Sequence, residues 1–356
     1  MPIVSLEKIK GILNKSGLNA EFRLDSENTW SSITKNGKNV PYLYMEHFVD
    51  YQAVHSNNLS SSLVDISLIL FHDNLPCGVW PLMFDIDAKE SLKSINNQYG
   101  GIVVPPLFIN NFPKKSERKI IKACIDFLNN LLSISAGDSW RTYDVFLSGY
   151  VSQWHQIALE NGAALNRVCY EMHLDISMPI DVIRKSIRKS YKPLVSAGLR
   201  KWTVSVMDQH CEDTWSKFRR LHKTVAGFIT RPIDTWNIQH QAIASGNAFL
   251  VYVLNSDGIM IGGGYFDMSC HQCYYSVGSY NKQLFDQPIG HIIQYQAILT
   301  MKEKGRKMYY LGDRFYKKDL PFVTDKQVDI SNFKQGFSSY IIPRVELIFQ
   351  FETTNN

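Results

Sequence analysis

The C-terminal part of the chain carries a lysine in a setting that could place a cation at a reaction centre. Residues 331–343 read SNFKQGFSSYIIP, in which Phe333 and Phe337 surround Lys334 and Gly336, and a β-like run follows. Most lysines are solvated surface charges, and an exposed lysine at the start of a strand is the ordinary alternative. Here two phenylalanines would bury the neighbourhood, and a glycine admits a close backbone approach. The pattern favours a functional role for Lys334.

A basic run forms a second candidate, and its sequence is IRKSIRKSYK. If the segment is helical, the i, i+4 spacing places Arg184, Arg188 and Lys192 on one face. That face could hold the diphosphate of a nucleotide-linked acceptor or the backbone of a tRNA acceptor stem. A charge run is more often a solvated helix face, but the run contains no interleaved acid, which favours a phosphate partner. The net charge of +5 suits an anionic ligand and is too small to indicate a dedicated nucleic-acid-binding protein.

Asp313 and Arg314 follow Leu311 and Gly312 at the end of an expected strand. Asp313 could orient or deprotonate an amine, or it could cap the next turn. Tyr310 and its neighbour Tyr309 alternate along the strand, so one is expected to point to each face.

Metal binding is not expected. The stretch CHQC at 270–273 offers two cysteines and His271, but a structural zinc site needs a second pair of ligands. The stretch also lies where a hairpin turn is expected. His47, His55 and His72 have no suitably spaced partners, and we interpret them as structural or rim residues.

The order of predicted elements repeats along the chain. Hairpins are expected at 71–85 and 253–267, and each is followed by a β-rich stretch, an amphipathic helix and a short strand. The two helices have apolar stripes within 116–132 and 290–305. Between the halves, residues 177–198 are expected to form a helix with Pro179 in its first turn, Pro193 ending or kinking it and Gly198 at its C-cap. A chain of 356 residues is long enough for two domains, and we divide it at 1–160 and 161–356.

The N-terminal segment MPIVSLEKIKGILNKSG is typical of an amphipathic helix and not of a signal peptide. No apolar run approaches the roughly 20 residues needed to cross a bilayer. The six cysteines are scattered, which suits reduced thiols. We therefore expect a cytoplasmic protein.

Three stretches resemble the FemAB-like family of aminoacyl- and acyltransferases, whose BioF2-like members occur in polysaccharide pathways. They are the basic segment with the strand after it, the block YYSVGSYNKQLFDQPIGHIIQYQAILTMKEKGRKMYYLGD, and ISNFKQGFSS, with Ser338 where the family usually has glycine. The resemblance covers roughly 175–345 by motif and 20–150 by architecture. It implies an α+β fold of two tandem GNAT-like domains (GCN5-related N-acetyltransferase), each a mixed, mostly antiparallel sheet flanked by helices. The main cleft would lie in 161–356, and 1–160 would be a degenerate copy.

The resemblance also implies roles for single residues. Lys334 matches the family lysine that stabilises the charge developing on the reacting carbonyl. Ser276 and Ser279 lie on the strand that lines the cleft in this fold, and Arg231 lies where the family has substrate-facing residues. Gln287 and Gly290 match half of the Q/R-x-x-G-x-G/A loop that binds the pyrophosphate of acetyl-CoA, whereas Ile292 replaces its last small residue and Pro288 removes an amide donor.

By this resemblance the chain is expected to transfer an acyl or aminoacyl group to an amine of a cell-envelope precursor. The acceptor would be an amino sugar, a nucleotide sugar or a peptidoglycan stem. The donor is open between acyl-CoA and aminoacyl-tRNA, with no metal. The alternative is a pair of degenerate domains that binds nucleic acid or an envelope complex without catalysis. The oligomeric state is open.

Overall fold

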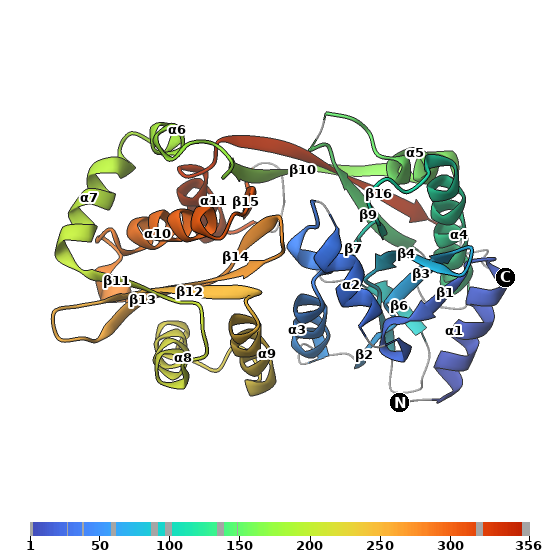
Figure 1. Cartoon of the computed structure of the whole chain (residues 1–356), viewed down its shortest axis with the longest axis horizontal. Coiled ribbons are helices and arrows are strands. Elements are labelled where there is room, and N and C mark those ends of the chain that lie inside the picture. Colours follow the sequence, from blue (N-terminus) through green and yellow to red (C-terminus); the bar gives the residue numbers. More distant parts are fainter. Residues whose placement is uncertain are drawn as a thin grey trace. The chain divides into compact units, whose positions relative to one another are not determined.

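The computed structural model describes residues 3–350 except 27, 38, 58–61, 87–91, 97–101, 134–138, 148 and 318–322. The chain forms two compact units (Figure 1). Unit 1 comprises Met1–Lys38, Leu43–Cys169 and Pro343–Asn356, and unit 2 comprises Asn39–Tyr42 and Tyr170–Ile342. The units are therefore not contiguous in sequence, because β10 (Ala164–Asp175) and β16 (Tyr340–Gln350) each contain residues of both. None of the described helices is long and apolar enough to cross a membrane.

Unit 1 is an α+β unit built on three small sets of strands. The first set pairs in the order β1-β3-β4-β8, the second in the order β2-β5-β6, and the third in the order β16-β9-β7. The bounds are β1 Ala20–Phe22, β2 Ser62–Asp65, β3 Leu68–His72, β4 Leu75–Trp80, β5 Met83–Ile86, β6 Leu92–Asn96, β7 Ile102–Val103, β8 Leu107–Phe108 and β9 Ser139–Val145. The helices are α1 Ile3–Lys15, α2 Thr29–Asn36, α3 Glu46–Asn57, α4 Lys114–Leu132 and α5 Gln153–Glu160.

The expected hairpin and helix of unit 1 are confirmed. β3 and β4 join at Asp73 and Asn74, whose φ angles of 50° and 62° are those of a tight hairpin turn. Helix α4 buries the apolar stripe predicted within 116–132, from Ile120 to Leu131. The stripe packs against Trp80, Trp140 and Trp154 in the core of the unit. The 3.6-residue period therefore predicted both the helix and its buried face.

Unit 2 is a six-stranded sheet with helices on both faces. The strand order is β11-β12-β13-β14-β15-β10, and β14 and β15 run parallel while the other pairs are antiparallel. The strands are β11 Thr203–Met207, β12 Ala248–Leu254, β13 Met260–Met268, β14 Gln272–Tyr280 and β15 Met308–Asp313. The helices are α6 Ile180–Ser186, α7 Tyr191–Lys201, α8 Glu212–Ala226, α9 Ile233–Ala244, α10 Ile289–Glu303 and α11 Asp325–Gln335.

Two hydrophobic cores join this sheet to its helices. One core joins β10, β12, β13, β14 and β15 to α6, α7 and α10, and it also contains Phe337. The other core joins β12 and β13 to α8 and α9 through Trp215, Phe218 and Trp236. The predicted helix within 290–305 is thus α10, and the hairpin predicted at 253–267 joins β12 to β13.

The prediction of one helix over 177–198 was wrong, because the segment forms two helices with a break at 187–190. Proline clashes with the carbonyl four residues earlier, so a helix cannot run through 189 to Pro193. Pro193 instead lies in the first turn of α7, where its missing N–H costs nothing. Gly198 lies inside α7 and does not cap it. An ideal Cβ on Gly198 would lie 2.6 Å from Ile292, so the glycine lets α7 approach α10 closely.

In unit 1, Arg23 forms an ion-pair network with three carboxylates. Its guanidinium donates to Asp65 Oδ2 at 2.5 Å and to Asp50 Oδ1 at 2.7 Å, and it lies 3.6 Å from Glu46. The side chains of Arg23 and Asp65 are only 5% and 9% exposed. A carboxylate so buried needs its cation, because an uncompensated buried charge costs several kcal/mol.

We expect Arg23→Met to lower the free energy of unfolding by about 3 kcal/mol or more, measured by urea denaturation. Lys10→Met removes an exposed pair with Asp25 and is the matched control, expected to cost less than about 1 kcal/mol. Equal losses in the two variants would contradict the assignment of Arg23 as a structural centre.

Candidate active site at the fork of two parallel strands

The parallel strands β14 and β15 separate inside unit 2. Their ladder pairs Gln272–Tyr274 with Met308–Tyr310. Beyond these residues β14 stays with β13 up to Tyr280, while β15 stays with β10 up to Asp313. Backbone N–H and C=O groups of parallel strands lie in the plane between them, so those of the diverging segments are directed into the opening. We call the segments 275–280 and 311–313 the β14–β15 fork.

Lys334 extends to this fork from helix α11. An ideal Cβ on Gly312 would lie 3.3 Å from Lys334 Nζ, and Nζ lies 5.0 Å from the centre of the Tyr275 ring. Gly312 has a φ of +101°, which only glycine adopts readily. Gly312 therefore permits both the turn of the strand and the approach of the ammonium. Lys334 lies in the last turn of a helix, not at the start of a strand.

Burial lowers the pKa of Lys334 to about 8, and the nearby charge of Asp313 acts in the opposite direction. The side chain is half-buried in the aromatic and backbone surroundings of the fork. A cation in such a place is poorly screened by water, so it attracts negative charge more strongly than an exposed lysine does. It can therefore stabilise an oxyanion that forms within its reach.

Aromatic rings fix the segment that carries Lys334. Phe333 lies edge-on to His291 at 5.1 Å between ring centres, and Tyr191 lies edge-on to His291 at 4.5 Å. Phe337 is fully buried and lies 5.2 Å from Tyr191. An ideal Cβ on Gly336 would come within 2.1 Å of the Tyr191 ring, so this position has no room for a larger residue. The expectation that the two phenylalanines bury the neighbourhood and the glycine admits a close approach is confirmed.

His291 is held neutral in this cluster. Burial, with a smaller contribution from the charge of Arg188, lowers the pKa of His291 to about 4. An uncharged imidazole adds no positive charge near Lys334 at neutral pH. Phe333 also covers Gly290, whose ideal Cβ would lie 3.1 Å from the ring.

Arg188 caps the end of α11. Its backbone N–H donates to Gly336 O at 2.8 Å, and its Nη2 donates to Asn332 O at 3.0 Å. Its Nη1 donates to the Tyr191 hydroxyl at 2.8 Å. Cationic donors satisfy the free carbonyls at a helix C-terminus and interact well with its dipole. The contacts of Arg188 therefore hold the turn that positions Lys334.

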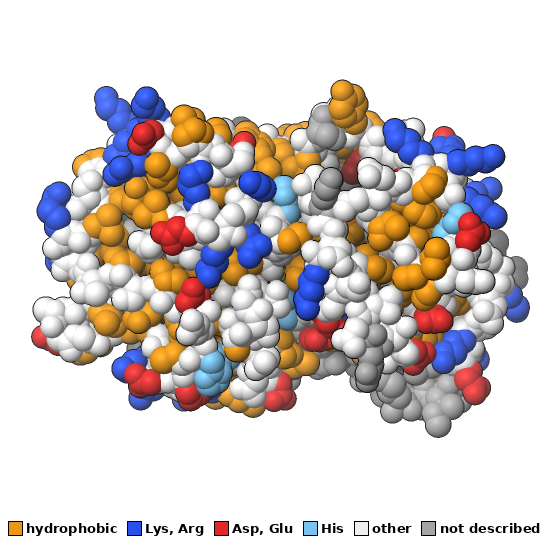
Figure 2. Space-filling view, in the orientation of Figure 1, with side chains coloured by type: hydrophobic (Ala, Val, Ile, Leu, Met, Phe, Trp, Pro, Cys, Tyr) orange, Lys and Arg blue, Asp and Glu red, His pale blue; other side chains and the backbone are white. Residues whose placement is uncertain are grey.

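The other two predicted basic residues, Arg184 and Lys192, lie on α6 and α7, on either side of the break that contains Arg188. Arg184 is exposed on α6, with its guanidinium 5.6 Å from the centre of the Tyr295 ring, and exposed Lys192 on α7 donates to Lys185 O at 3.2 Å. The expectation that Arg184, Arg188 and Lys192 share one helix face was wrong because the helix breaks between them. Figure 2 shows Lys and Arg side chains gathered over α6 and α7.

Several other predicted residues do converge near the fork. The Tyr310 hydroxyl donates to Asp313 Oδ1 at 2.7 Å, which orients that carboxylate. Arg314 donates to Gln335 Oε1 at 2.7 Å and to Ser331 Oγ at 2.9 Å, so it joins the end of β15 to α11. Gln287 is not among them: it lies just before α10 and accepts from Lys201 Nζ, at the end of α7, at 2.9 Å.

Glu171 and His173, which the sequence analysis did not single out, lie on β10 of the same sheet. His173 Nε2 lies 3.0 Å from Glu171 Oε2, and the His173 ring stacks on Tyr310 at 5.1 Å. Of the two predicted serines, Ser276 donates to the buried Asp267, and Ser279 is buried three residues further along β14. Glu171 pairs in register with Asp313. The alternation of Glu171 and His173 in YEMHLD was the available signal, because it marks one polar face of a strand.

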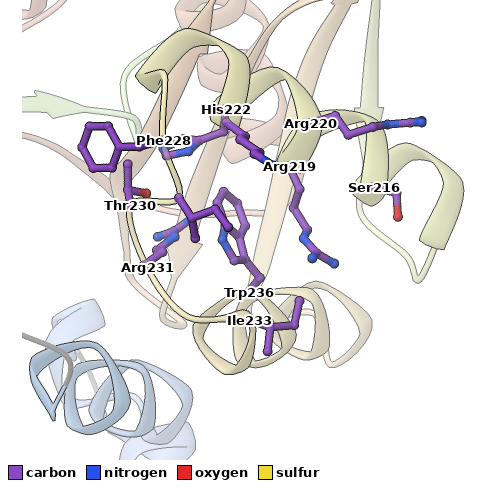
Figure 3. Close-up of a pocket in the computed structure, with 11 residues that line it drawn as sticks. Ser216, Arg219, Arg220, His222, Phe228, Thr230, Arg231, Ile233 and Trp236 are labelled. Atoms are coloured by element: carbon purple, nitrogen blue, oxygen red, sulfur yellow. The ribbon is translucent and has the colours of Figure 1, made fainter.

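Arg231 lies in a pocket between α8 and α9 (Figure 3). The cavity has a volume of about 530 Å³. The Arg231 side chain is buried, with its guanidinium 3.7 Å from the centre of the Trp236 ring. Burial, with the charge of Arg231, lowers the pKa of His222 to about 4. The pocket is lined by Ser216, Arg219, Arg220, His222, Lys223, Phe228, Ile229, Thr230, Arg231, Ile233 and Trp236.

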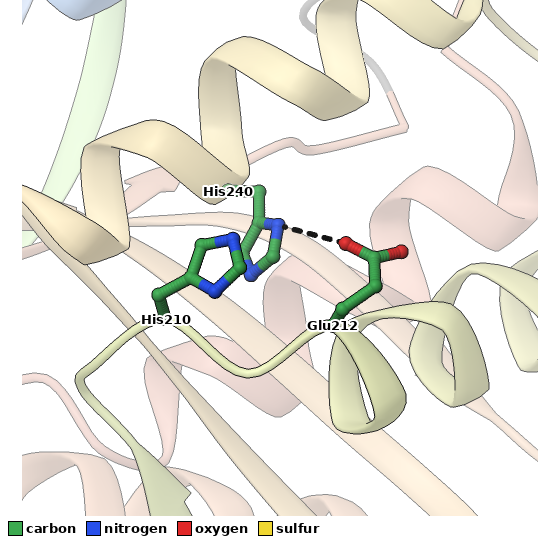
Figure 4. Close-up of side chains that lie close together, drawn as sticks. All are labelled: His210, Glu212 and His240. Atoms are coloured by element: carbon green, nitrogen blue, oxygen red, sulfur yellow. Dashed lines mark ion pairs between the residues drawn. The ribbon is translucent and has the colours of Figure 1, made fainter.

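One group of metal-ligating residue types occurs among the described residues, formed by His210, Glu212 and His240 (Figure 4). His240 Nε2 accepts the N–H of Cys211, and Nδ1 lies 3.4 Å from Glu212 Oε2. The two imidazoles stack at 4.2 Å with 22° between their planes, so their in-plane lone pairs do not converge on one point. We interpret His240 as a cap at the start of α8. Of the CHQC cysteines, Cys270 is exposed and Cys273 buried.

No protein-family model matches the sequence, and no curated protein matches it. Three solved structures are similar in fold. FemX has a TM-score of 0.69 at 14% identity, covering 94% of this chain and 98% of FemX. L-PGS from Bacillus licheniformis has a TM-score of 0.54 at 11% identity, covering 97% and 91%. A conserved protein of unknown function from Bacteroides thetaiotaomicron has a TM-score of 0.53 at 8% identity, covering 94% and 100%. These similarities confirm the predicted FemAB-like α+β fold of tandem GNAT-like units.

The contacts of Arg188 predict that replacing this residue lowers the stability of the folded chain. We expect Arg188→Met to lower the free energy of unfolding by about 1–3 kcal/mol, because the Asn332 carbonyl and the Tyr191 hydroxyl lose their guanidinium donors. Arg184→Met is the matched control from the same basic run, and we expect a change within about 0.5 kcal/mol. Urea denaturation of both variants measures the difference. A larger loss for Arg184→Met would contradict the assignment.

Proposed function

We propose that the chain transfers an acyl or aminoacyl group to an amine, with Lys334 stabilising the oxyanion of the tetrahedral intermediate. The observation that carries the proposal is the half-buried ammonium beside Gly312 and Tyr275 at the β14–β15 fork, with a pKa lowered to about 8. A residue whose pKa is shifted by burial and which faces a backbone opening is a candidate for chemistry. The fold shared with FemX supports the same class of reaction.

The reaction would proceed by addition and elimination. The neutral amine nitrogen bonds to the donor carbonyl carbon, and the carbonyl electron pair moves to the oxygen, where Lys334 balances the charge. The intermediate then collapses, and the carbon–sulfur bond of a thioester or the carbon–oxygen bond of an aminoacyl ester breaks. The amine loses one proton, and the departing sulfur or oxygen gains one. We assign the orientation of the amine and the acceptance of its proton to Asp313, whose carboxylate is fixed by Tyr310.

The acceptor is proposed to be an amine-bearing precursor of the cell envelope with an anionic group, in keeping with the FemAB resemblance. The buried guanidinium of Arg231 supports an anion contact in the α8–α9 pocket. The donor is acyl-CoA or aminoacyl-tRNA. Exposed cations on α6 and α7, among them Arg184 and Lys192, support a phosphate-bearing donor of either kind.

Single-turnover assays with labelled acyl-CoA or aminoacyl-tRNA and an amino sugar, a nucleotide sugar or a peptidoglycan stem peptide test the proposal. We expect Lys334→Met to lower the rate of acyl transfer about 100-fold or more, because the oxyanion loses its cation. Lys326→Met changes an exposed lysine of the same helix and is expected to leave the rate unchanged.

The pH dependence provides a second readout. Because the ammonium is the active form, the rate should fall as pH rises through about 8, and Lys334→Arg should move this limb to higher pH. The folded pKa lies below the ordinary 10.5, so the charged form opposes folding below about pH 8. Lys334→Met should therefore be at least as stable as the wild type at neutral pH. Unchanged transfer in Lys334→Met would refute the role, and no transfer by the wild type with any donor would favour a binding module.

A further inference from the structure

The end of helix α8 presents apolar side chains to solvent. Gly227, with a φ of 85°, ends the helix, and Phe228 and Ile229 follow it with 65% and 71% of their surfaces exposed. Ile233, at the start of α9, is 48% exposed. Single exposed apolar residues are common, whereas three within six positions at one helix junction form a contiguous apolar projection. Figure 3 shows Phe228 projecting away from the helix pair.

Cationic side chains accompany these apolar residues. Arg219, Arg220 and Lys223 lie on α8 and line the same pocket as Phe228 and Ile229. The described lining residues include no aspartate or glutamate, and Asp234 follows Ile233 outside the lining. Arg220 and Lys223 are exposed, and Arg219 is half-buried. The surface thus combines a cationic band with an apolar projection. We call Arg219, Arg220, Lys223, Phe228, Ile229 and Ile233 the basic tip.

We propose that the basic tip docks the chain on a bilayer that contains anionic lipids, with Phe228 and Ile229 in the interfacial region and the three cations at the headgroups. Interfacial binding scales with buried apolar area and with attraction to anionic lipid, and the tip supplies both. A small free anion would leave Phe228 and Ile229 exposed, whereas a bilayer interface takes up both the apolar side chains and the cations.

This docking does not depend on acyl transfer, so the two proposals fail separately. If both hold, the tip brings the enzyme to acceptors that are presented at a membrane surface. The membrane binding is expected to be peripheral, because only two or three apolar side chains and the three cations of the basic tip contribute to its free energy.

The test is flotation of the full chain with vesicles of phosphatidylcholine alone and of phosphatidylcholine mixed with phosphatidylglycerol. We expect binding to the anionic vesicles only, weakened by added salt. Each of Arg219→Gln, Arg220→Gln and Lys223→Gln should lower the affinity about fivefold. The double variant Phe228→Ser with Ile229→Ser should abolish binding.

Matched controls come from the same unit. Ile259→Ser changes an apolar residue that is 60% exposed in the β12–β13 hairpin, and Lys189→Gln changes an exposed cation of the basic run. Both should bind like the wild type. Circular dichroism melting curves should be unchanged in the variants of Arg220, Lys223, Phe228 with Ile229, Lys189 and Ile259, because the replaced side chains are exposed. The proposal is overturned if the wild type does not float with anionic vesicles, or if the double variant floats as well as the wild type.

Discussion

The proposed chemistry depends on one electrostatic constraint, the partial removal of the Lys334 ammonium from water. Moving a cation out of solvent is unfavourable, and the lowered pKa of Lys334 expresses that cost. Three features offset part of it: the face of the Tyr275 ring, the charge of Asp313 and the negative end of the α11 dipole. The part of the desolvation cost that is not offset favours the binding of negative charge, because an oxyanion that forms at the fork would meet a poorly screened cation.

Much of the surrounding packing keeps this cation in place. Gly312 gives the ammonium access to the strand, and Gly336 gives the Tyr191 ring access to the end of α11. Arg188 donates to the carbonyls of the same helix end. A site that must hold a reacting carbonyl within a fraction of an ångström needs such support from neighbouring residues. The segment 331–338 therefore positions the lysine as well as supplying it.

Local patterns in the sequence predicted the parts that depend on local physics. Periodicity identified α4 and α10, the turn residues Asp73 and Asn74 lie in the predicted hairpin, and the aromatics around Lys334 predicted its burial. The helix over 177–198 was predicted to end or kink at Pro193. It breaks earlier, at 187–190, because a proline disrupts the helical turn that precedes it. The role of Arg188 could not be predicted, since its partners Asn332 and Gly336 are distant in sequence. The same holds for Glu171 with Asp313, whose proximity depends on strand pairing.

The most direct test of the account is the titration of the Lys334 ammonium itself. Nuclear magnetic resonance of isotope-labelled lysine side chains follows each ammonium as the pH rises. We predict one lysine with a pKa of about 8, whose signal is absent from the Lys334→Met variant and unchanged in Lys326→Met. If every lysine titrates near the ordinary value of about 10.4, the Lys334 ammonium is solvated and the central claim is contradicted.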